Sequence, residues 1–411
     1  MKNKRTKIIL ITLGILLIIG VGVLWLYLLV FNTNNEGTYT ELPTPEGTNR
    51  PPTDTAPQEP RVDTAPVTST GDRQVLRQLT TDPVAGSVFT DDGIRYVAKG
   101  TGHIFDIDFS SGIETQITNT TVPQTIKALF SPDAQTILLT AEHNNSHEHF
   151  IGTVRIGDSG IGSIVNGATL PTNINNLEFD TDNTTLYYTL AEEQGLDGYQ
   201  YLIADARPHR LFSLPLTDMR ILWGDTIYAY TIPSAYQIGY IYEVDDTNLK
   251  YVTPGRTGLM GMRFGDTLVT SFGADNTLYT QAHTATNSDI TPWFLTLFPE
   301  KCVYDNTQSQ PVAFCTVPRE LHKEMYPDQW YKGLVSFSDS LWRIDITNNS
   351  FIRLANFQEL SGRALDIYSI ALSTSGQYLS LINKNDDTLW LFDIWLYEQQ
   401  NIPQPPPNRE G

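Results

Sequence analysis

Residues 130–140, FSPDAQTILLT, show the pattern that decides the fold: an apolar strand, a tight turn at Asp133-Ala134, and a second apolar strand. The same unit recurs along the chain, and the steps from one turn to the next are 41, 49, 43, 41, 39 and 70. Five of these six steps are close to the ~40–45 residues of one β-propeller blade. The turns are marked by Asp92, Asp133, Asp182, Asp225, Asp266, Asp305 and Ser375.

A second hairpin follows the first within several units, as in 104–117 (IFDIDFSSGIETQI), 201–214 (YLIADARPHRLFSL) and 343–355 (RIDITNNSFIRLA). Two hairpins make four antiparallel strands, and such a sheet buries both faces only by packing between neighbours. The sequence therefore predicts an all-β fold, a seven-bladed β-propeller over residues 74–398. A β-sandwich, or a pair of them, is the alternative, but it does not explain a repeat of this length.

The two ends of this region are predicted to meet. Segment 74–79 (QVLRQL) precedes the first unit, and 388–394 (TLWLFDI) ends the last one. Pairing of the first segment with the second would supply the outer strand of the last blade and close the ring.

The segment FSPDAQTILLT resembles the strand–turn–strand signature of WD40-like, TolB-type β-propellers, and the likeness extends over residues 74–395. The chain is also similar to bacterial membrane-anchored propellers of unassigned role, through 83–108 (PVAGSVFTDDGIRYVAKGTGHIFDID), the paired PEKCVY and AFCTVP segments, and 326–345 (YPDQWYKGLVSFSDSLWRID). The resemblance implies the fold and leaves the activity open, because propellers carry many unrelated functions.

The N-terminal region predicts a membrane anchor. Residues 8–31 form a run of 24 residues without a charge, about 36 Å long as a helix, which is enough to cross a bilayer. The basic head, residues 1–7, should stay in the cytoplasm, so the propeller would be extracytoplasmic. A cleaved signal peptide is the alternative. Seven prolines in 32–73 predict a disordered Pro/Thr-rich tether, and 399–411 a disordered tail.

The charge balance excludes one class of partner. Beyond residue 31 the chain has 23 basic and 46 acidic residues, a net charge of −23. A nucleic-acid-binding body would need a basic stripe instead, so we expect no nucleic-acid partner. No dinucleotide or phosphate-loop motif is present, and we expect no cofactor.

Cys302 and Cys315 are the two cysteines of the chain, and they lie symmetrically about one predicted turn. They should face each other across a hairpin, and an extracytoplasmic location would allow oxidation. We therefore predict a structural disulfide, with a redox pair or metal ligands as alternatives.

The segment AEHNNSHEHF contains three of the seven histidines: His143, His147 and His149. On a strand, His147 and His149 would share a face and could bind one metal ion. The alternative is a polar loop between the second and third strands of a blade.

Residues 316–340 form the longest insertion and account for the one long step in the repeat. This segment contains Arg319, Tyr326, Trp330 and Tyr331, residue types that partner-binding loops use. The alternative is that Trp330 and Tyr331 pack on the neighbouring blade.

The function predicted from these features is a non-catalytic binding or scaffolding module, held in the cell membrane by one helix, for a protein or glycan partner in the cell envelope. A propeller hydrolase or lyase with its site at the central channel is one alternative, and an envelope assembly factor is another. Several acids with an Arg or His at one channel mouth, with shifted pKa values, would favour an enzyme.

Overall fold

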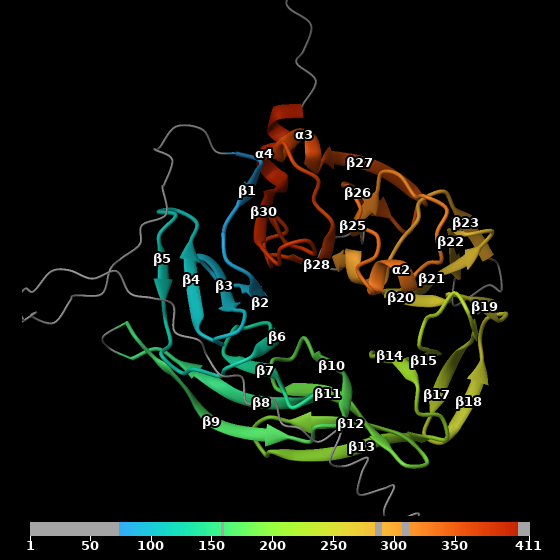
Figure 1. Cartoon of the computed structure of the whole chain (residues 1–411), viewed down its shortest axis with the longest axis horizontal. Coiled ribbons are helices and arrows are strands. Elements are labelled where there is room, and N and C mark those ends of the chain that lie inside the picture. The colour runs from blue at the N-terminus through green and yellow to red at the C-terminus, as the bar shows by residue number, and fades with distance from the viewer. Residues whose placement is uncertain (1–73, 158–159, 284–289, 306–311, 402–411) are drawn as a thin grey trace, which may run out of the picture. The chain divides into compact units, whose positions relative to one another are not determined.

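The computed structural model describes residues 74–157, 160–283, 290–305 and 312–401, and these form seven four-stranded antiparallel sheets arranged as a ring. The all-β, seven-bladed propeller predicted from the sequence repeat is confirmed (Figure 1). In each blade the strand nearest the centre comes first in sequence, apart from blade 7, which takes its outer strand from the start of the described chain.

The first four blades follow one another along the chain. Blade 1 comprises β2 (Val84–Phe89), β3 (Gly93–Ala98), β4 (Ile104–Asp108) and β5 (Glu114–Gln116). Blade 2 comprises β6 (Thr125–Phe130), β7 (Thr136–His143), β8 (Ser146–Arg155) and β9 (Ser163–Leu170). Blade 3 comprises β10 (Ile174–Phe179), β11 (Thr185–Glu192), β12 (Gly195–Leu202) and β13 (Arg207–Leu214). Blade 4 comprises β14 (Met219–Leu222), β15 (Ile227–Thr231), β17 (Ile241–Asp245) and β18 (Asn248–Tyr251), beside a small ladder of β16 (Ile238–Gly239) and β19 (Arg256–Thr257).

The remaining blades complete the ring. Blade 5 comprises β20 (Met260–Phe264), β21 (Thr267–Ala274), β22 (Thr277–His283) and β23 (Ile290–Trp293). Blade 6 comprises β24 (Cys302–Asp305), β25 (Val312–Pro318), β26 (Asp339–Asp345) and β27 (Ser350–Asn356). Blade 7 comprises β28 (Ile367–Leu372), β29 (Tyr378–Asn383), β30 (Leu389–Asp393) and β1 (Leu76–Gln78). The helices are η1 (Pro299–Lys301), α2 (Asp328–Tyr331), α3 (Phe357–Ser361) and α4 (Ile394–Asn401), so residues 399–401 of the predicted tail are helical.

The repeat markers lie where the first strand of each blade meets the second. Six of the seven fall in these turns, and Asp305 is the last residue of β24. In the turn after β6, the Asp133 carboxylate accepts hydrogen bonds from the Ser131 hydroxyl at 2.6 Å and the Gln135 N–H at 3.0 Å. This local bonding explains why an acid recurs there: it satisfies backbone donors that a tight turn leaves unpaired. We call the face of the ring that carries these turns the turn face.

The hydrophobic core consists of layers between adjacent blades. Leu138 of blade 2 packs with Leu186 and Tyr188 of blade 3, and Leu341 of blade 6 packs with Phe392 of blade 7; all five are buried. A blade therefore buries its faces against its two neighbours, as the repeat implies.

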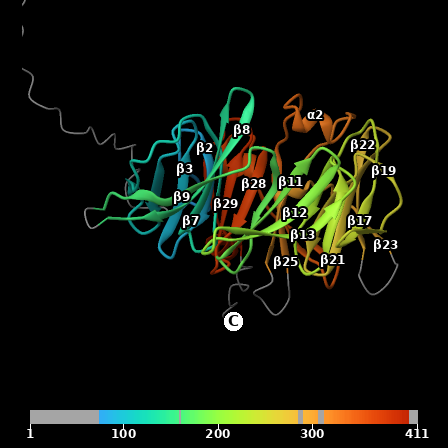
Figure 2. The ribbon, with the colours of Figure 1, turned by 90° about the horizontal axis from the view of Figure 1, so that it is seen from below.

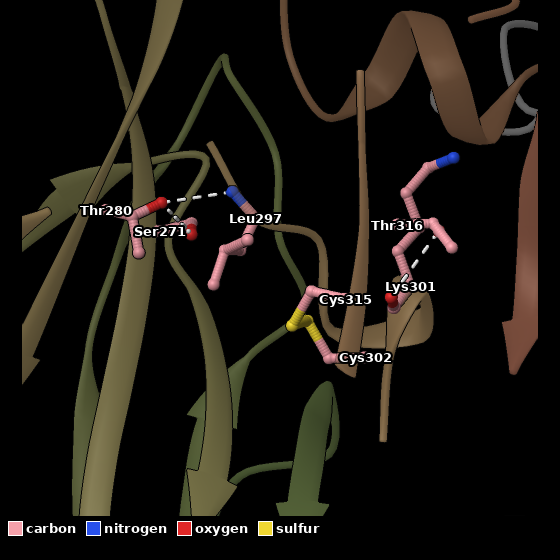
Figure 3. Close-up of a disulfide and its surroundings, with 7 residues drawn as sticks. All are labelled: Ser271, Thr280, Leu297, Lys301, Cys302, Cys315 and Thr316. Atoms are coloured by element: carbon pink, nitrogen blue, oxygen red, sulfur yellow. Dashed lines mark hydrogen bonds between the residues drawn. A yellow bond between two sulfur atoms is a disulfide. The ribbon is translucent and has the colours of Figure 1, made fainter. Parts of the chain in front are cut away.

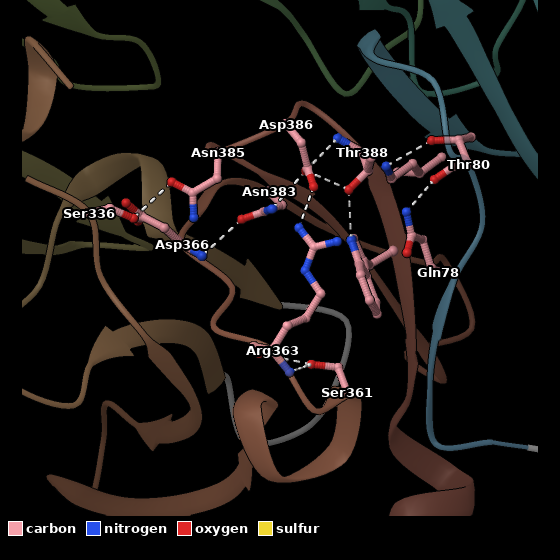
Figure 4. A network of polar contacts seen from close by, with 12 residues as sticks. Gln78, Thr80, Ser336, Ser361, Arg363, Asp366, Asn383, Asn385, Asp386 and Thr388 are labelled. Carbon is pink, nitrogen blue, oxygen red and sulfur yellow. Dashed lines mark hydrogen bonds and ion pairs between the residues drawn. The ribbon is translucent and has the colours of Figure 1, made fainter.

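The ring is closed by the predicted pairing of the two ends. β1 runs antiparallel to β30, with Leu76 opposite Phe392 and Gln78 opposite Trp390. Two further hydrogen bonds extend the ladder. The Leu79 N–H donates to the Leu389 carbonyl at 2.8 Å. The Thr80 hydroxyl (Figure 4) accepts a hydrogen bond from the Leu389 N–H at 3.0 Å. Both ends of the described chain thus contribute to one sheet.

The insertion, which we define as residues 319–338 between β25 and β26, covers the face opposite the turn face, where α2 stands above the ring (Figure 2). The Asp328 carboxylate accepts hydrogen bonds from the Ser234 hydroxyl (3.2 Å) and the Ala235 N–H (2.6 Å) of blade 4. On the other side, the Ser336 hydroxyl donates to Asn385 of blade 7 at 2.8 Å (Figure 4). The insertion therefore bridges blades 4, 6 and 7.

A buried ion cluster lies beneath the insertion. Lys301 Nζ contacts Asp339 at 2.5 Å and Asp366 at 2.7 Å, and all three side chains are inaccessible to solvent. The Trp330 indole N–H and the Phe337 N–H donate to Asp366, at 3.0 Å and 3.1 Å, so the cluster also holds the insertion in place. Breaking such a cluster leaves a buried charge without compensation, which is strongly destabilising.

Among the described residues, no helix is long and apolar enough to cross a membrane. The predicted transmembrane segment 8–31 and the tether 32–73 lie outside the described residues, as do residues 402–411 of the tail.

The closing strand yields a first prediction. Leu76 is 4% exposed in the core beside Phe392, so Leu76→Ala should lower the free energy of unfolding by about 2–4 kcal/mol. The matched control is Leu334→Ala, because Leu334 is 68% exposed. Chemical denaturation measures both variants, and equal stability of the two would contradict closure of the ring by β1.

The ion cluster yields a second prediction. Burial raises the pKa of Asp339 to about 6, with attraction to Lys301 opposing and the Asp366 charge adding to the rise. The folded state therefore takes up a proton at a higher pH than the unfolded chain, and the contribution of Asp339 to stability falls as the pH rises from about 4 to about 6. Asp339→Asn should remove about 1–3 kcal/mol of this pH dependence.

This effect is measured as a difference between two proteins. Unfolding free energies at pH 4.5 and pH 7.5 are compared for the wild type and Asp339→Asn, so that contributions of other acids cancel. The wild type should lose more stability than the variant between the two pH values. The same loss in both would contradict the proposed titration.

Candidate functional site

The channel cleft is a cavity of about 720 Å³ that opens where inner strands β10, β14, β20 and β24 approach one another. Turn residues of blades 3, 4 and 5 lie at its mouth, so it opens on the turn face. Concave sites of this size commonly bind small ligands. The residues used below to describe it are Glu178, Asp180, Tyr187, Trp223, Gly224, Asp225, Arg263, Phe264, Gly265, Cys302 and Tyr304.

The electrostatic centre of the cleft is Glu178 on β10. Burial raises the pKa of Glu178 to about 7, the Asp180 charge raises it further, and Arg263 opposes the rise. Asp180 itself accepts a hydrogen bond from the Tyr187 hydroxyl at 3.0 Å. Glu178 is nevertheless exposed to solvent on β10, so water moderates this rise and the carboxyl group is accessible to a ligand.

Arg263 on β20 is fixed in the cleft by the backbone of two turns. Its Nε donates to the Gly265 carbonyl at 2.8 Å and its Nη1 to the Thr226 carbonyl at 3.1 Å. Gly224 has a φ of +148°, and a Cβ there would overlap the guanidinium group. The turn of blade 4 therefore needs glycine so that Arg263 can lie across it.

Aromatic rings line the cleft on both sides of these charges. Tyr187 stacks on Trp223 with ring centres 5.1 Å apart, and Phe264 stacks on Tyr304 at 6.0 Å. The Tyr304 hydroxyl lies over Gly265, where a Cβ would come within 2.6 Å of it. The Trp223 N–H donates to the Asn176 carbonyl of blade 3 at 2.7 Å, which fixes the indole. These walls are rigid before any ligand arrives.

Three acids and an arginine meet here, and the pKa of one acid is shifted, which is the arrangement expected of a channel enzyme; the same groups can also bind a ligand. Among the described residues that line the cleft there is no histidine, serine or lysine, and Cys302 is part of a disulfide. The Tyr187 and Thr181 hydroxyls donate to the Asp180 carboxylate, at 3.0 Å and 3.3 Å, so the described lining has hydroxyl–carboxylate pairs but no hydroxyl beside a histidine or lysine. The acids, the fixed guanidinium and the rings are groups that recognise a ligand by charge, hydrogen bonding and stacking.

The predicted disulfide is confirmed. Cys302 on β24 and Cys315 on β25 are direct register partners, and their sulfur atoms are bonded (Figure 3). The bond ties the inner strand of blade 6, which borders the cleft, to the second strand. Cys315 is fully buried, so the bond is shielded from solvent on that side.

The three histidines lie in the hairpin between the second and third strands of blade 2. His149 is buried, with Nδ1 3.1 Å from the Thr140 hydroxyl, and burial lowers its pKa to about 4, as do the charges of His147 and Lys127. The rings of His147 and His149 are 6.4 Å apart, and His143 is exposed. In the described part of the chain no group of three or more His, Cys, Asp or Glu is close enough to hold a metal ion. Metal binding by these histidines stays a prediction.

The four candidate partner-binding residues of the insertion differ in position. Tyr326 and Trp330 are 2% and 1% exposed, within an aromatic cluster that includes Phe298 and Phe337. Tyr331 is partly exposed, and its hydroxyl donates to Glu300 at 2.9 Å. Arg319 is exposed, and partner binding by this segment stays a prediction.

Apart from Cys302 and the turn residue Asp225, the groups of the channel cleft and of the ion cluster were not predicted from the sequence. One signal was present: Glu178 and Arg263 each stand two residues before the first turn of a blade, where other inner strands have Leu129 and Leu222. A charge at a position that the repeat fills with apolar residues marks a place where the strand meets the channel instead of a neighbouring blade. Lys301, Asp339 and Asp366 carry no such signal, since they lie far apart in sequence.

Comparison with solved structures supports the fold. The β-propeller domain of the Trilobed protease from Pyrococcus furiosus, which has an open Velcro topology, matches with a TM-score of 0.50 and 11% identity, over 76% of this chain and 95% of its own. An oligogalacturonate lyase in complex with manganese matches with a TM-score of 0.51 and 10% identity, over 77% and 92%. TolB from Acinetobacter baumannii matches with a TM-score of 0.34 and 17% identity, over 52% and 55%, which is too partial to bear on the fold.

No protein-family model and no curated protein sequence matches this chain. At identities as low as these, the structural matches concern the fold alone. The chain is a seven-bladed β-propeller, and its fold is similar to that of the Pyrococcus propeller domain.

The cleft yields a third prediction. Because the Asp180 charge helps to raise the pKa of Glu178, Asp180→Asn should move that pKa back toward the usual range of a glutamate. Carboxyl ¹³C NMR of glutamate-labelled protein measures the titration. Asp245→Asn, a change at an exposed position on β17, is the control and should leave the titration as it is. If the pKa of Glu178 were the same in the wild type and in Asp180→Asn, the two carboxylates would not interact.

Proposed function

We propose that this chain is a binding module of the cell envelope that holds a protein partner at the channel cleft and does not catalyse a reaction. The proposal rests on one observation: a cleft at the channel mouth gathers three acids and stacked aromatic rings, with no histidine, serine or lysine among its described lining residues. An apolar helix at residues 8–31 would anchor the chain, with the N-terminus in the cytoplasm and the propeller outside.

Charge favours a partner that presents a basic segment. Glu178, Asp180 and Asp225 line the cleft, while its one lining cation among the described residues, Arg263, already donates to two backbone carbonyls. The whole chain has a net charge of −19, which would steer a cationic partner toward it and repel an anionic one. Tyr187 and Tyr304, which are partly exposed, would supply the apolar contact area, and the buried Trp223 would support Tyr187 from below.

Two other ligands or roles have some support in the same cleft. Rings beside carboxylates also suit sugars, so a glycan partner is the second candidate. A channel enzyme is the third, because a glutamate with a pKa of about 7 can transfer protons. We prefer binding because no histidine or lysine lies beside the acids among the described lining residues.

The fourth prediction tests binding with two probes. The full-length chain is titrated by fluorescence anisotropy with a labelled, capped pentapeptide that has two lysines beside a tryptophan, and with labelled peptidoglycan fragments. The peptide should bind, and binding should weaken with added salt because surface charges are screened. Glu178→Gln and Asp225→Asn should each weaken it about three- to tenfold, whereas Asp245→Asn, at the exposed position on β17, should have no effect.

Each other result contradicts part of the proposal. Binding of the glycan and not of the peptide would replace the protein partner by a sugar. Cleavage of either probe, lost in Glu178→Gln, would establish an enzyme. If neither Glu178→Gln nor Asp225→Asn changed binding, the channel cleft would not be the binding site.

A separate experiment tests the location. Tags at the two ends of the chain are labelled with a membrane-impermeant reagent in intact cells. Labelling of the C-terminal tag alone supports an extracytoplasmic propeller, and labelling of the N-terminal tag alone overturns it.

A further inference from the structure

A second cavity, which we call the rim pocket, lies between blades 5 and 6 at the start of the insertion. It encloses about 440 Å³, and its lining includes Phe294, Arg319, Leu321, Ser340, Trp342 and Arg353. Phe294 follows β23, Trp342 belongs to β26 and Arg353 to β27, so three strands and the insertion meet here. It lies at the outer part of the ring, and no lining residue is shared with the channel cleft.

The apolar wall of the rim pocket is unusually open to solvent. Phe294 is 70% exposed, although its ring makes edge contacts with Trp342 at 5.8 Å and with Phe351 at 4.9 Å. An aromatic side chain held in this way offers contact area at little cost in conformational entropy, which is typical of binding hot spots.

The charge of the rim pocket is opposite to that of the protein. Arg319 and Arg353 both line it, and no Asp or Glu occurs in the lining that the structure describes. Arg319 Nη1 donates to the Gln358 side chain at 3.0 Å, which orients its guanidinium group without neutralising it. Neither arginine forms an ion pair with another described residue, although the chain has a net charge of −19.

A buried hydroxyl adds a polar group to the same cavity. Ser340 is 2% exposed, lines the pocket, and its Oγ has no hydrogen-bond partner among the described residues. A buried polar atom without a partner costs free energy that a ligand oxygen or N–H could recover. The pocket therefore combines two cations without an acidic neighbour in its lining, an unpaired hydroxyl and an exposed aromatic wall.

We infer that the rim pocket is a docking site for an acidic peptide segment of a partner protein, one that places an aromatic or large aliphatic side chain beside carboxylates. The apolar side chain packs against Phe294 and Trp342, and the carboxylates pair with Arg319 and Arg353. Bidentate pairing of arginine with carboxylate requires a defined orientation of the two groups, so it adds specificity as well as affinity. This inference stands on residues that the channel cleft does not use.

The fifth prediction tests the inference with a capped tripeptide that has a phenylalanine between two glutamates. The full-length chain should bind it by isothermal titration, and the same tripeptide with glutamines in place of the glutamates should bind at least about tenfold more weakly. Arg353→Gln and Phe294→Ser should each weaken binding of the acidic peptide by about five- to tenfold. Glu178→Gln, in the channel cleft, should leave it unchanged.

The matched control is Arg343→Gln. Arg343 lies beside Trp342 on β26 but pairs with Glu398 of α4 at 3.4 Å and does not line the pocket. Its replacement should leave peptide binding as in the wild type. Thermal unfolding of each variant shows that the fold is intact, which we expect because Phe294 and Arg353 are exposed.

Three results would overturn the inference. The first is no binding of the acidic tripeptide by the wild type. The second is equal weakening by Arg343→Gln and Arg353→Gln, which would indicate a general charge effect. The third is tighter binding of phenylacetate than of the peptide with the same dependence on Arg353 and Phe294, which would assign the pocket to a small aromatic carboxylate.

Discussion

The structure depends on one constraint: every four-stranded sheet must have both of its faces covered by neighbouring sheets. Leu138, Leu186 and Leu341 are buried because they lie between blades, and none could be buried within a single blade. The constraint is met only when the ring is complete, so the stability of the ring depends on β1 although this strand has only three residues. Both pockets follow from the same geometry, since one lies at the channel mouth and the other where two blades diverge at the rim.

The ion cluster attaches the insertion to the ring of blades. Lys301 precedes the inner strand of blade 6, Asp339 begins β26, and Asp366 precedes β28. At the junction of blades 6 and 7, these three buried charges take the place of apolar packing. Each is stable there only because it is paired with an opposite charge. Because Trp330 donates to Asp366, the insertion is fixed over this junction and cannot swing away without exposing the cluster.

The seven blades could be predicted from the sequence, whereas most residues of the candidate sites could not, for physical reasons. Turn chemistry is local, so residues such as Asp133 and Asp182 revealed all seven blades, and register symmetry revealed the Cys302–Cys315 bond. The channel cleft instead joins four blades, and nothing local relates Glu178 to Arg263 except their shared place in the repeat. The insertion was correctly recognised as a distinct segment, but burial of Tyr326 and Trp330 depends on contacts with residues as distant as Asp366.

The pairing of β1 with β30 has a consequence for biosynthesis. The first described strand leaves the ribosome almost a whole propeller ahead of its partner, so it must wait without a sheet to join. Until β30 emerges, the half-built array presents unpaired strand edges that can template association with other chains. Closure of the ring is therefore a late event in folding, which can happen only after β30 has emerged.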